Sequence, residues 1–142
     1  MIEIQILDGA TARLLVDPFY ERNGRRRCAR NEDLFFLAMD GGKVLGCVRY
    51  CVEDGTPMLR TMMVDAGHRR CGIGSRLLQE FTSYLETHDI RGVYCLPYSH
   101  LDGFYATVGF KRISANEAPT FLKDRMKSYD PSGTLYLFMR RP

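Results

Sequence analysis

The sequence has no apolar run that approaches the roughly 20 residues of a membrane-spanning helix. It also has no internal repeat and no low-complexity tract. The N-terminal Met-Ile-Glu-Ile-Gln-Ile alternates apolar and polar residues and lacks the basic and apolar regions of a secretory signal peptide. With 142 residues, of which 45% are hydrophobic and 26% charged, the composition predicts one globular domain over residues 1–142, located in the cytoplasm.

The cysteines are too irregular in number and spacing for a structural framework. The five residues are Cys28, Cys47, Cys51, Cys71 and Cys95, an odd number without a Cys-x-x-Cys pair. This pattern argues against a disulfide framework and against a zinc site, so no metal is expected. Cys47, Cys51 and Cys95 fall in apolar, strand-like segments and are predicted to be buried.

Charge is only mildly unbalanced, with a formal net charge of +3. The single basic run is Arg25-Arg26-Arg27 with Arg30, and no aromatic residues or nucleic-acid motif accompany it. We therefore expect a solvated loop here and no nucleic-acid partner, while a nucleic-acid-binding domain remains a third functional alternative.

Hydrophobic periodicity predicts a mixed α/β fold of the α+β kind. Strands are expected over residues 2–7, 34–39, 44–52, 58–64, 93–96, 110–113 and 135–139. Helices are expected over residues 10–22, 73–88, 101–107 and 121–129. Antiparallel hairpins thus come first, followed by one strand–helix–strand unit.

The segment from Val64 to Leu78 carries the strongest functional signal. An apolar strand leads into Arg-x-x-Gly-x-Gly over residues 69–74, which opens directly into an amphipathic helix. A helix N-terminus presents unpaired N–H groups and the positive end of the helix dipole, and glycines allow an anion to approach the backbone. No acid lies between Asp65 and Glu80, whereas three arginines do. The segment therefore predicts a phosphate-binding loop.

Together with a second block, this loop resembles the GNAT superfamily of acyl-CoA N-acyltransferases. The first block is residues 61–78, and the second is residues 103–110, Gly-Phe-Tyr-Ala-Thr-Val-Gly-Phe, which is similar to the family's Phe-Tyr-x-x-x-Gly-Phe segment. The resemblance implies a central, mostly antiparallel mixed sheet of about seven strands. Helices flank this sheet, and it splays at the strand before the phosphate loop. The resemblance also implies acetyl-CoA as co-substrate.

The resemblance further implies roles for individual residues. The backbone of Met62, Met63 and Val64 would bind the pantetheine arm, and Arg69 fills the first position of the loop motif. The amides that would cradle the pyrophosphate belong to Arg70, Cys71, Gly72, Ile73, Gly74 and Ser75. Tyr105 matches the family's general acid, which protonates the departing CoA thiolate. The alternative for Tyr105 is a core aromatic residue on an amphipathic helix.

The acceptor side departs from the family pattern. Positions where several members carry a catalytic glutamate hold Met58 and Val93, and Tyr98 replaces an asparagine common in relatives. A base is needed only if the amine arrives protonated and no water chain removes its proton. The side chains available as bases are Glu53, Asp54 and His100.

Arg49 and Arg60 lie in strands expected to border the acceptor site. Simple alternation places Arg60 on one strand face with Met58, Met62 and Val64. Its guanidinium would then either bind a substrate carboxylate or extend to solvent. Tyr98 and His100 are expected to line the same pocket.

The leading hypothesis is an N-acetyltransferase that transfers an acetyl group from acetyl-CoA to a primary amine by direct attack. A small-molecule amine, with or without a carboxylate, is favoured over a protein amine. The alternative is a non-catalytic acyl-CoA-binding or regulatory module. No membrane partner is expected, and a homodimer through the C-terminal strands is an open possibility.

Overall fold

The computed structural model describes residues 1–27 and 29–142, so the expectation for Cys28 lies outside the described residues. The strands are β1 (Ile2–Asp8), β2 (Leu34–Asp40), β3 (Lys43–Glu53), β4 (Thr56–Val64), β5 (Val93–Cys95), β6 (Lys111–Ile113) and β7 (Phe138–Arg141). The helices are α1 (Gly9–Arg22), α2 (Ile73–Thr87), α3 (Asp102–Ala106) and α4 (Thr120–Tyr129). Short 3-10 turns occur at Ala66–His68, Ser99–Leu101 and Ala115–Glu117.

The described strands form one seven-stranded sheet in the order β1-β2-β3-β4-β5-β7-β6. The first four strands are an antiparallel meander, β5 lies parallel to β4, and β7 pairs antiparallel with β5 and β6. The expected mixed, mostly antiparallel sheet is thus confirmed. The strand–helix–strand unit is β4, α2 and β5.

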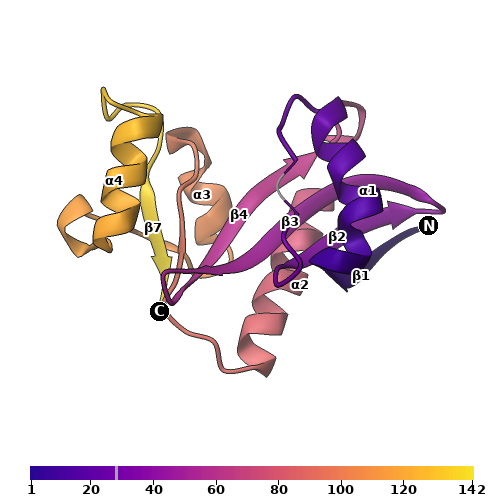
Figure 1. The fold of residues 1–142 in the computed structure, drawn as a ribbon, viewed down its shortest axis with the longest axis horizontal. Coiled ribbons are helices and arrows are strands. Elements are labelled where there is room, and N and C mark those ends of the chain that lie inside the picture. The colour runs from indigo at the N-terminus through magenta and orange to yellow at the C-terminus, as the bar shows by residue number, and fades with distance from the viewer. Residues whose placement is uncertain (28) are drawn as a thin grey trace.

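Helices cover both faces of the sheet (Figure 1). The apolar stripe of α2, including Leu77 and Phe81, packs against Phe36 on one face. On the opposite face, Phe19 of α1 packs in a separate core with Phe35. Consecutive strand residues such as Phe35 and Phe36 point to opposite faces, so the doubly buried strands read as nearly continuous apolar runs.

A β-bulge in β4 changes which side chains share a face. Cys47 of β3 pairs with Met63 and Arg49 pairs with Arg60, so Thr61 and Met62 together oppose one residue. Thr61 has a φ of 48°, in the left-handed region.

The bulge makes the expected common face for Arg60, Met62 and Val64 wrong. Met58 packs with Cys51 and Leu122 of α4, whereas Met62 and Val64 contact the core beneath α2. One extra residue reverses the alternation, so side chains on either side of the bulge swap faces.

The last strand begins at Phe138, three residues later than the expected 135–139. The buried carboxylate of Asp130 accepts hydrogen bonds from the amides of Thr134, Leu135 and Tyr136 at 3.3, 2.8 and 3.0 Å. Three consecutive amides that point at one carboxylate cannot also join a regular strand ladder. Tyr136 instead forms an isolated antiparallel bridge with Tyr98, outside the strands of the sheet.

Two further observations concern residues 1–27 and 29–142. Cys47, Cys51 and Cys95 are buried free thiols, as predicted. In this part of the chain no helix is long and apolar enough to cross a membrane, and no group of metal-ligating side chains is suitably arranged for a metal ion.

Candidate acyltransfer site

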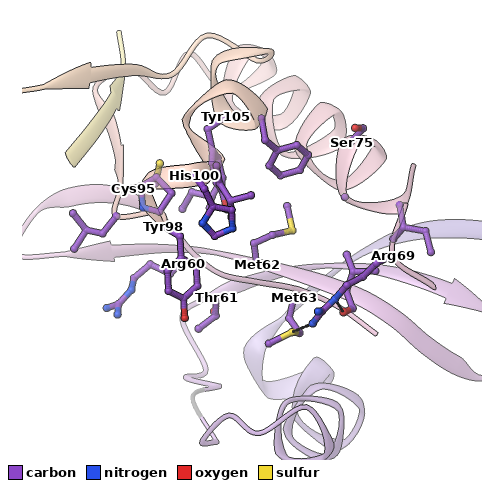
Figure 2. Close-up of a pocket in the computed structure, with 18 of the residues that line it drawn as sticks. Arg60, Thr61, Met62, Met63, Arg69, Ser75, Cys95, Tyr98, His100 and Tyr105 are labelled. Atoms are coloured by element: carbon purple, nitrogen blue, oxygen red, sulfur yellow. Dashed lines mark hydrogen bonds between the residues drawn. The ribbon is translucent and has the colours of Figure 1, made fainter. Parts of the chain in front are cut away.

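A cavity occupies the opening between β4 and β5. These parallel strands are joined by a single residue pair, Met58 and Tyr94, and separate beyond it. The cavity has a volume of about 950 Å³ and is bordered by β4, the loop before α2, and the segment from β5 to α3. Figure 2 shows Ser75 and Arg69 at one end of this opening and Arg60 and Tyr98 at the other.

The end of the cavity at α2 is built from backbone. Arg70 and Gly72 adopt φ values of 66° and 79°, which turn the chain sharply into the helix. The first hydrogen bond of α2 runs from the Arg76 N–H to the Gly72 carbonyl at 3.1 Å. Among the described residues, no backbone carbonyl accepts from the amides of residues 71–75. Those N–H groups are therefore available to an anion at the positive end of the helix dipole.

The side chains of this loop lie partly outside the cavity. Arg69 lines the cavity and folds back so that its Nε donates to the Val64 carbonyl at 3.2 Å. Cys71 is exposed, is absent from the cavity wall, and donates its Sγ–H to the Arg69 carbonyl at 3.7 Å. The remaining predicted donor-site residues all line the cavity: Met62, Met63, Val64, Arg70, Gly72, Ile73, Gly74 and Ser75.

Tyr105 lies in the cavity wall with its side chain only 5% exposed. Its ring makes edge-to-face contacts with Phe104 and Phe110, at centroid distances of 5.2 and 6.0 Å. The hydroxyl makes no hydrogen bond within the described part of the chain. Burial raises the pKa of Tyr105 well above its usual value of 10, so the phenol stays protonated.

The opposite end of the cavity is rich in aromatic rings. Tyr98 stacks on Tyr136 at a centroid distance of 4.7 Å and lies 5.8 Å from the ring of His100. Tyr129 of α4 completes the group, 6.1 Å from Tyr136. The predicted pocket residues Tyr98 and His100 therefore meet Tyr129 and Tyr136, which the sequence did not indicate as site residues.

Arg60 also lines this end, but its guanidinium is already engaged. Its two terminal nitrogens donate to Glu53 at 2.8 Å and to the Tyr129 hydroxyl at 2.7 Å. Arg125 of α4 forms a second ion pair with Glu53. Burial alone would raise the pKa of Glu53, but hydrogen bonds and charge from Arg60 and Arg125 outweigh it and lower the pKa to about 2.

Two other predicted residues lie elsewhere. Arg49 is absent from the cavity wall and is buried beside Asp33, with which it forms an ion pair at 3.3 Å. Asp54 occupies the exposed turn between β3 and β4 with a φ of 50°. Met58 and Val93, at the positions of the family's glutamates, are fully buried. Of the three possible bases, only His100 lines the cavity.

Arg25 is a cavity residue that sequence reasoning missed. Gly24, with a φ of 80°, ends α1 in a Schellman motif in which the Arg25 amide donates to the Tyr20 carbonyl at 2.8 Å. The Asn23-Gly24 pair is a helix-stop signal, but nothing in the local sequence indicates that the chain then turns toward β4.

The neighbouring arginines of the basic run have other partners. Arg27 pairs with Glu21 at 2.7 Å, and Arg30 pairs with Asp33 at 3.4 Å. The expected solvated loop thus holds for Arg26 and Arg27 but not for Arg25, and the run does not form one continuous basic patch.

The charged side chains in the described cavity wall are all basic. Arg25, Arg60, Arg69 and Arg70 contribute guanidinium groups, and no Asp or Glu is present in that wall. The cavity is therefore suited to anionic ligands along its whole length.

A sheet opened between two parallel strands, with exposed helix amides at one end and a buried phenol in the wall, defines an acyl-CoA-dependent N-acyltransferase. The family model described as an acetyltransferase (GNAT) domain matches residues 31–112. The chain therefore belongs to the GNAT acetyltransferase family.

Solved structures share this fold. The Escherichia coli ribosomal-protein-S18-alanine N-acetyltransferase is 18% identical with a TM-score of 0.73, covering 100% of this chain and 94% of its own. A Pseudomonas aeruginosa acyl-CoA N-acyltransferase is 16% identical with a TM-score of 0.71, covering 100% of both chains.

A third structure, Neisseria gonorrhoeae N-acetylglutamate synthase complexed with coenzyme A and N-acetyl-glutamate, is 19% identical with a TM-score of 0.70. It covers 99% of this chain but 35% of its own length. No curated protein sequence matches the chain.

Proposed function

We propose that this chain transfers the acetyl group of acetyl-CoA to the primary amine of a small molecule. The observation that carries the proposal is the cavity between β4 and β5, because it joins a helix N-terminus suited to phosphate to a region lined by aromatic and basic side chains. Such a channel accepts a long anionic donor from one end and an acceptor from the other. A cytoplasmic location and a single domain over residues 1–142 remain predictions, as does a homodimer.

The donor side uses mainly backbone groups. The amides of residues 70–75 would hold the pyrophosphate, assisted by the guanidinium groups of Arg69 and Arg70. Beyond Met58, the edge of β4 that faces β5 has no strand partner among the described residues. The backbone of Met62, Met63 and Val64 can therefore bind an extended pantetheine arm as an added strand would.

Tyr105 would act on the leaving sulfur. In the reaction, the amine nitrogen bonds to the acetyl carbonyl carbon, the carbon–sulfur bond breaks, and the nitrogen loses a proton. The buried phenol retains its proton at neutral pH and so can donate it to the thiolate as negative charge develops there. Because no residue in the described part of the chain hydrogen-bonds the Tyr105 hydroxyl, that hydroxyl is free to make this bond.

His100 is the side chain best placed to accept the amine proton. It lies in the cavity wall beside Tyr98, and Figure 2 shows it between Tyr105 and Arg60. Glu53 is unsuited, since a carboxylate whose pKa is held at about 2 by two arginines is a very weak base.

The first test is release of free CoA thiol from acetyl-CoA across a panel of amines. We expect Tyr105→Phe to lower kcat by roughly a hundredfold, the lower part of the usual range for general-acid catalysis. Thermal stability should be almost unchanged, because the ring contacts remain and no hydrogen bond to another described residue is lost. Tyr94→Phe, a matched change outside the cavity wall, should leave kcat unaltered.

Unchanged kcat in Tyr105→Phe would eliminate its role as the acid. If CoA raised the melting temperature but no amine gave turnover, the alternative of a non-catalytic acyl-CoA-binding module would be favoured. The absence of a glutamate at Met58 and Val93 supports that alternative. A peptide N-terminus in the panel tests the protein-amine alternative, since one structural neighbour is named for acting on ribosomal protein S18.

A further inference from the structure

We infer that Arg25 binds a carboxylate on the acceptor, so that the preferred acceptors are small primary amines carrying a carboxylate group. The inference rests on the proposed acetyl transfer and adds to it the chemical class of acceptor and the residue that recognises it. Arg60, which the sequence had indicated for this task, is instead occupied by Glu53 and Tyr129.

The position of Arg25 is fixed by a connected set of contacts rather than by a loose loop. Its amide donates to the Tyr20 carbonyl, and the Tyr20 hydroxyl in turn donates to the carbonyl of Thr61 at 2.7 Å. One tyrosine thus ties the end of α1 to the bulge of β4, at the edge of the cavity. The neighbouring Asn23 strengthens this attachment by donating to Asp65 at 2.9 Å.

The Arg25 guanidinium itself is uncommitted. In residues 1–27 and 29–142 it forms no ion pair and no side-chain hydrogen bond, while the side chain is half-buried in the cavity wall. It lies near Tyr105 and Tyr136, where its positive charge opposes the rise in their pKa values. Arg25 therefore shares the cavity wall with the phenol of Tyr105 and with Tyr136 of the aromatic end.

The charge balance of the cavity selects among acceptor classes. With four arginines and no acid in its described wall, the cavity disfavours polyamines and other multiply cationic acceptors. Glu53, which is not part of the cavity wall, neutralises the charge of Arg60 through an ion pair. Arg25 is therefore the cation available to the acceptor. A planar guanidinium matches a carboxylate through two parallel N–H···O bonds, which also fixes the orientation of the amine.

The test compares acceptors that differ only in charge. L-Alanine with L-alaninamide, β-alanine with β-alaninamide, and L-glutamate with its α-carboxamide are assayed for CoA release, with spermidine as the cationic arm. We expect the wild-type protein to prefer the carboxylate members. Arg25→Ala should raise their KM by about 10- to 100-fold, as for a lost charge-assisted hydrogen bond.

Arg25→Lys should raise the KM for the carboxylate acceptors less than Arg25→Ala does. Neither variant should change the KM for acetyl-CoA. The matched control is Arg26→Ala, which removes an exposed arginine one residue away and outside the cavity wall. Three results would overturn the inference while leaving acetyl transfer intact. The first two are an equal rise in KM for acids and carboxamides in Arg25→Ala, and a rise in its KM for acetyl-CoA. The third is a preference of the wild-type protein for spermidine.

If no amine releases CoA, the proposed function fails, and the inference is judged by binding alone. Calorimetric titration of the N-acetyl derivatives of the same pairs into the CoA-saturated protein then decides it. Tighter binding of the acid than of the carboxamide, lost in Arg25→Ala but kept in Arg26→Ala, would support a carboxylate site. Binding that is absent or independent of Arg25 would refute it.

Discussion

Replacing Glu53 by Gln should remove a large, pH-dependent part of the stability of this fold. The Glu53 side chain is 12% exposed and joins β3 to Arg60 of β4 and Arg125 of α4. Its pKa falls from the usual 4.5 to about 2. At about 1.4 kcal/mol for each pKa unit, this difference corresponds to about 3 kcal/mol of unfolding free energy at neutral pH.

The direction of the pH dependence of this stability follows from proton binding. A carboxyl group with a depressed pKa in the folded state binds more protons when unfolded, so its contribution is complete above pH 4.5 and declines as the pH falls toward 2. About 2 of the 3 kcal/mol should be lost by pH 3. The difference between wild type and Glu53→Gln should therefore be about 3 kcal/mol at pH 7 and fall to about 1 kcal/mol at pH 3.

Urea unfolding at the two pH values measures this difference directly. Glu80→Gln is the matched control, because Glu80 is an exposed carboxylate without an ion pair in the described chain. Its effect should be small at both pH values. Two results would refute a stabilising role for the charge of Glu53 between Arg60 and Arg125. One is a Glu53→Gln protein as stable as wild type at pH 7, and the other is equal destabilisation at both pH values.

Two further substitutions test the ends of the cavity. Gly72→Ala should cost about 1–2 kcal/mol of unfolding free energy, because its φ of 79° disfavours a side chain, and should raise the KM for acetyl-CoA. Gly67→Ala in the same loop is the control: a Cβ meets nothing within 4 Å at either position, but only Gly72 has a positive φ. Asp130→Asn should release the turn before Tyr136 and lower kcat/KM for the acceptor by roughly tenfold or more, with the acetyl-CoA KM unchanged. An equal rise in both KM values would instead mean that the turn supports the fold as a whole.

Most of the residues proposed for the donor half do line the cavity, and the sequence could indicate them because they are contiguous. The proposed phosphate-binding loop requires only a strand, glycines and a helix N-terminus in succession, and all of these lie within residues 61–78. A short motif indicated Tyr105 as the candidate acid, but its burial, and the lack of a hydrogen-bond partner for its hydroxyl among the described residues, required the structure. The order of secondary-structure elements followed from periodicity for the same local reason.

Two sequence predictions were wrong, the common face of Arg60, Met62 and Val64 and the start of the last strand. At both places, contacts with distant residues override the local preference for a regular strand. Thr61 is β-branched, and its left-handed conformation is unexpected from sequence, yet the hydroxyl of Tyr20 holds its carbonyl. The Asp130 carboxylate captures amides up to six residues ahead and delays the last strand. In each case a side chain takes hydrogen bonds that periodicity assigns to a regular ladder.

The acceptor half could be predicted only in part, through Arg60, Tyr98 and His100, because it is assembled from segments that are far apart in the chain. Arg25 follows α1, Arg60 lies in β4, Tyr98 follows β5, and Tyr129 and Tyr136 flank the turn at Asp130. No short motif links these positions, and charge pairing decides which arginine is free to bind. Arg49 and Arg60 each pair with an acid, whereas Arg25 has no acidic partner among residues 1–27 and 29–142.

Tyr20 links the two halves of the proposed reaction through the β4 bulge. Its hydroxyl fixes the Thr61 carbonyl, next to the strand residues that would hold the donor, while its carbonyl fixes the amide of Arg25. A bound acceptor carboxylate would therefore be positioned relative to the same backbone that positions the thioester. Such shared anchoring is one way in which a site holds two reactants in attack geometry, and it would make the end of α1 part of the proposed acyltransfer site.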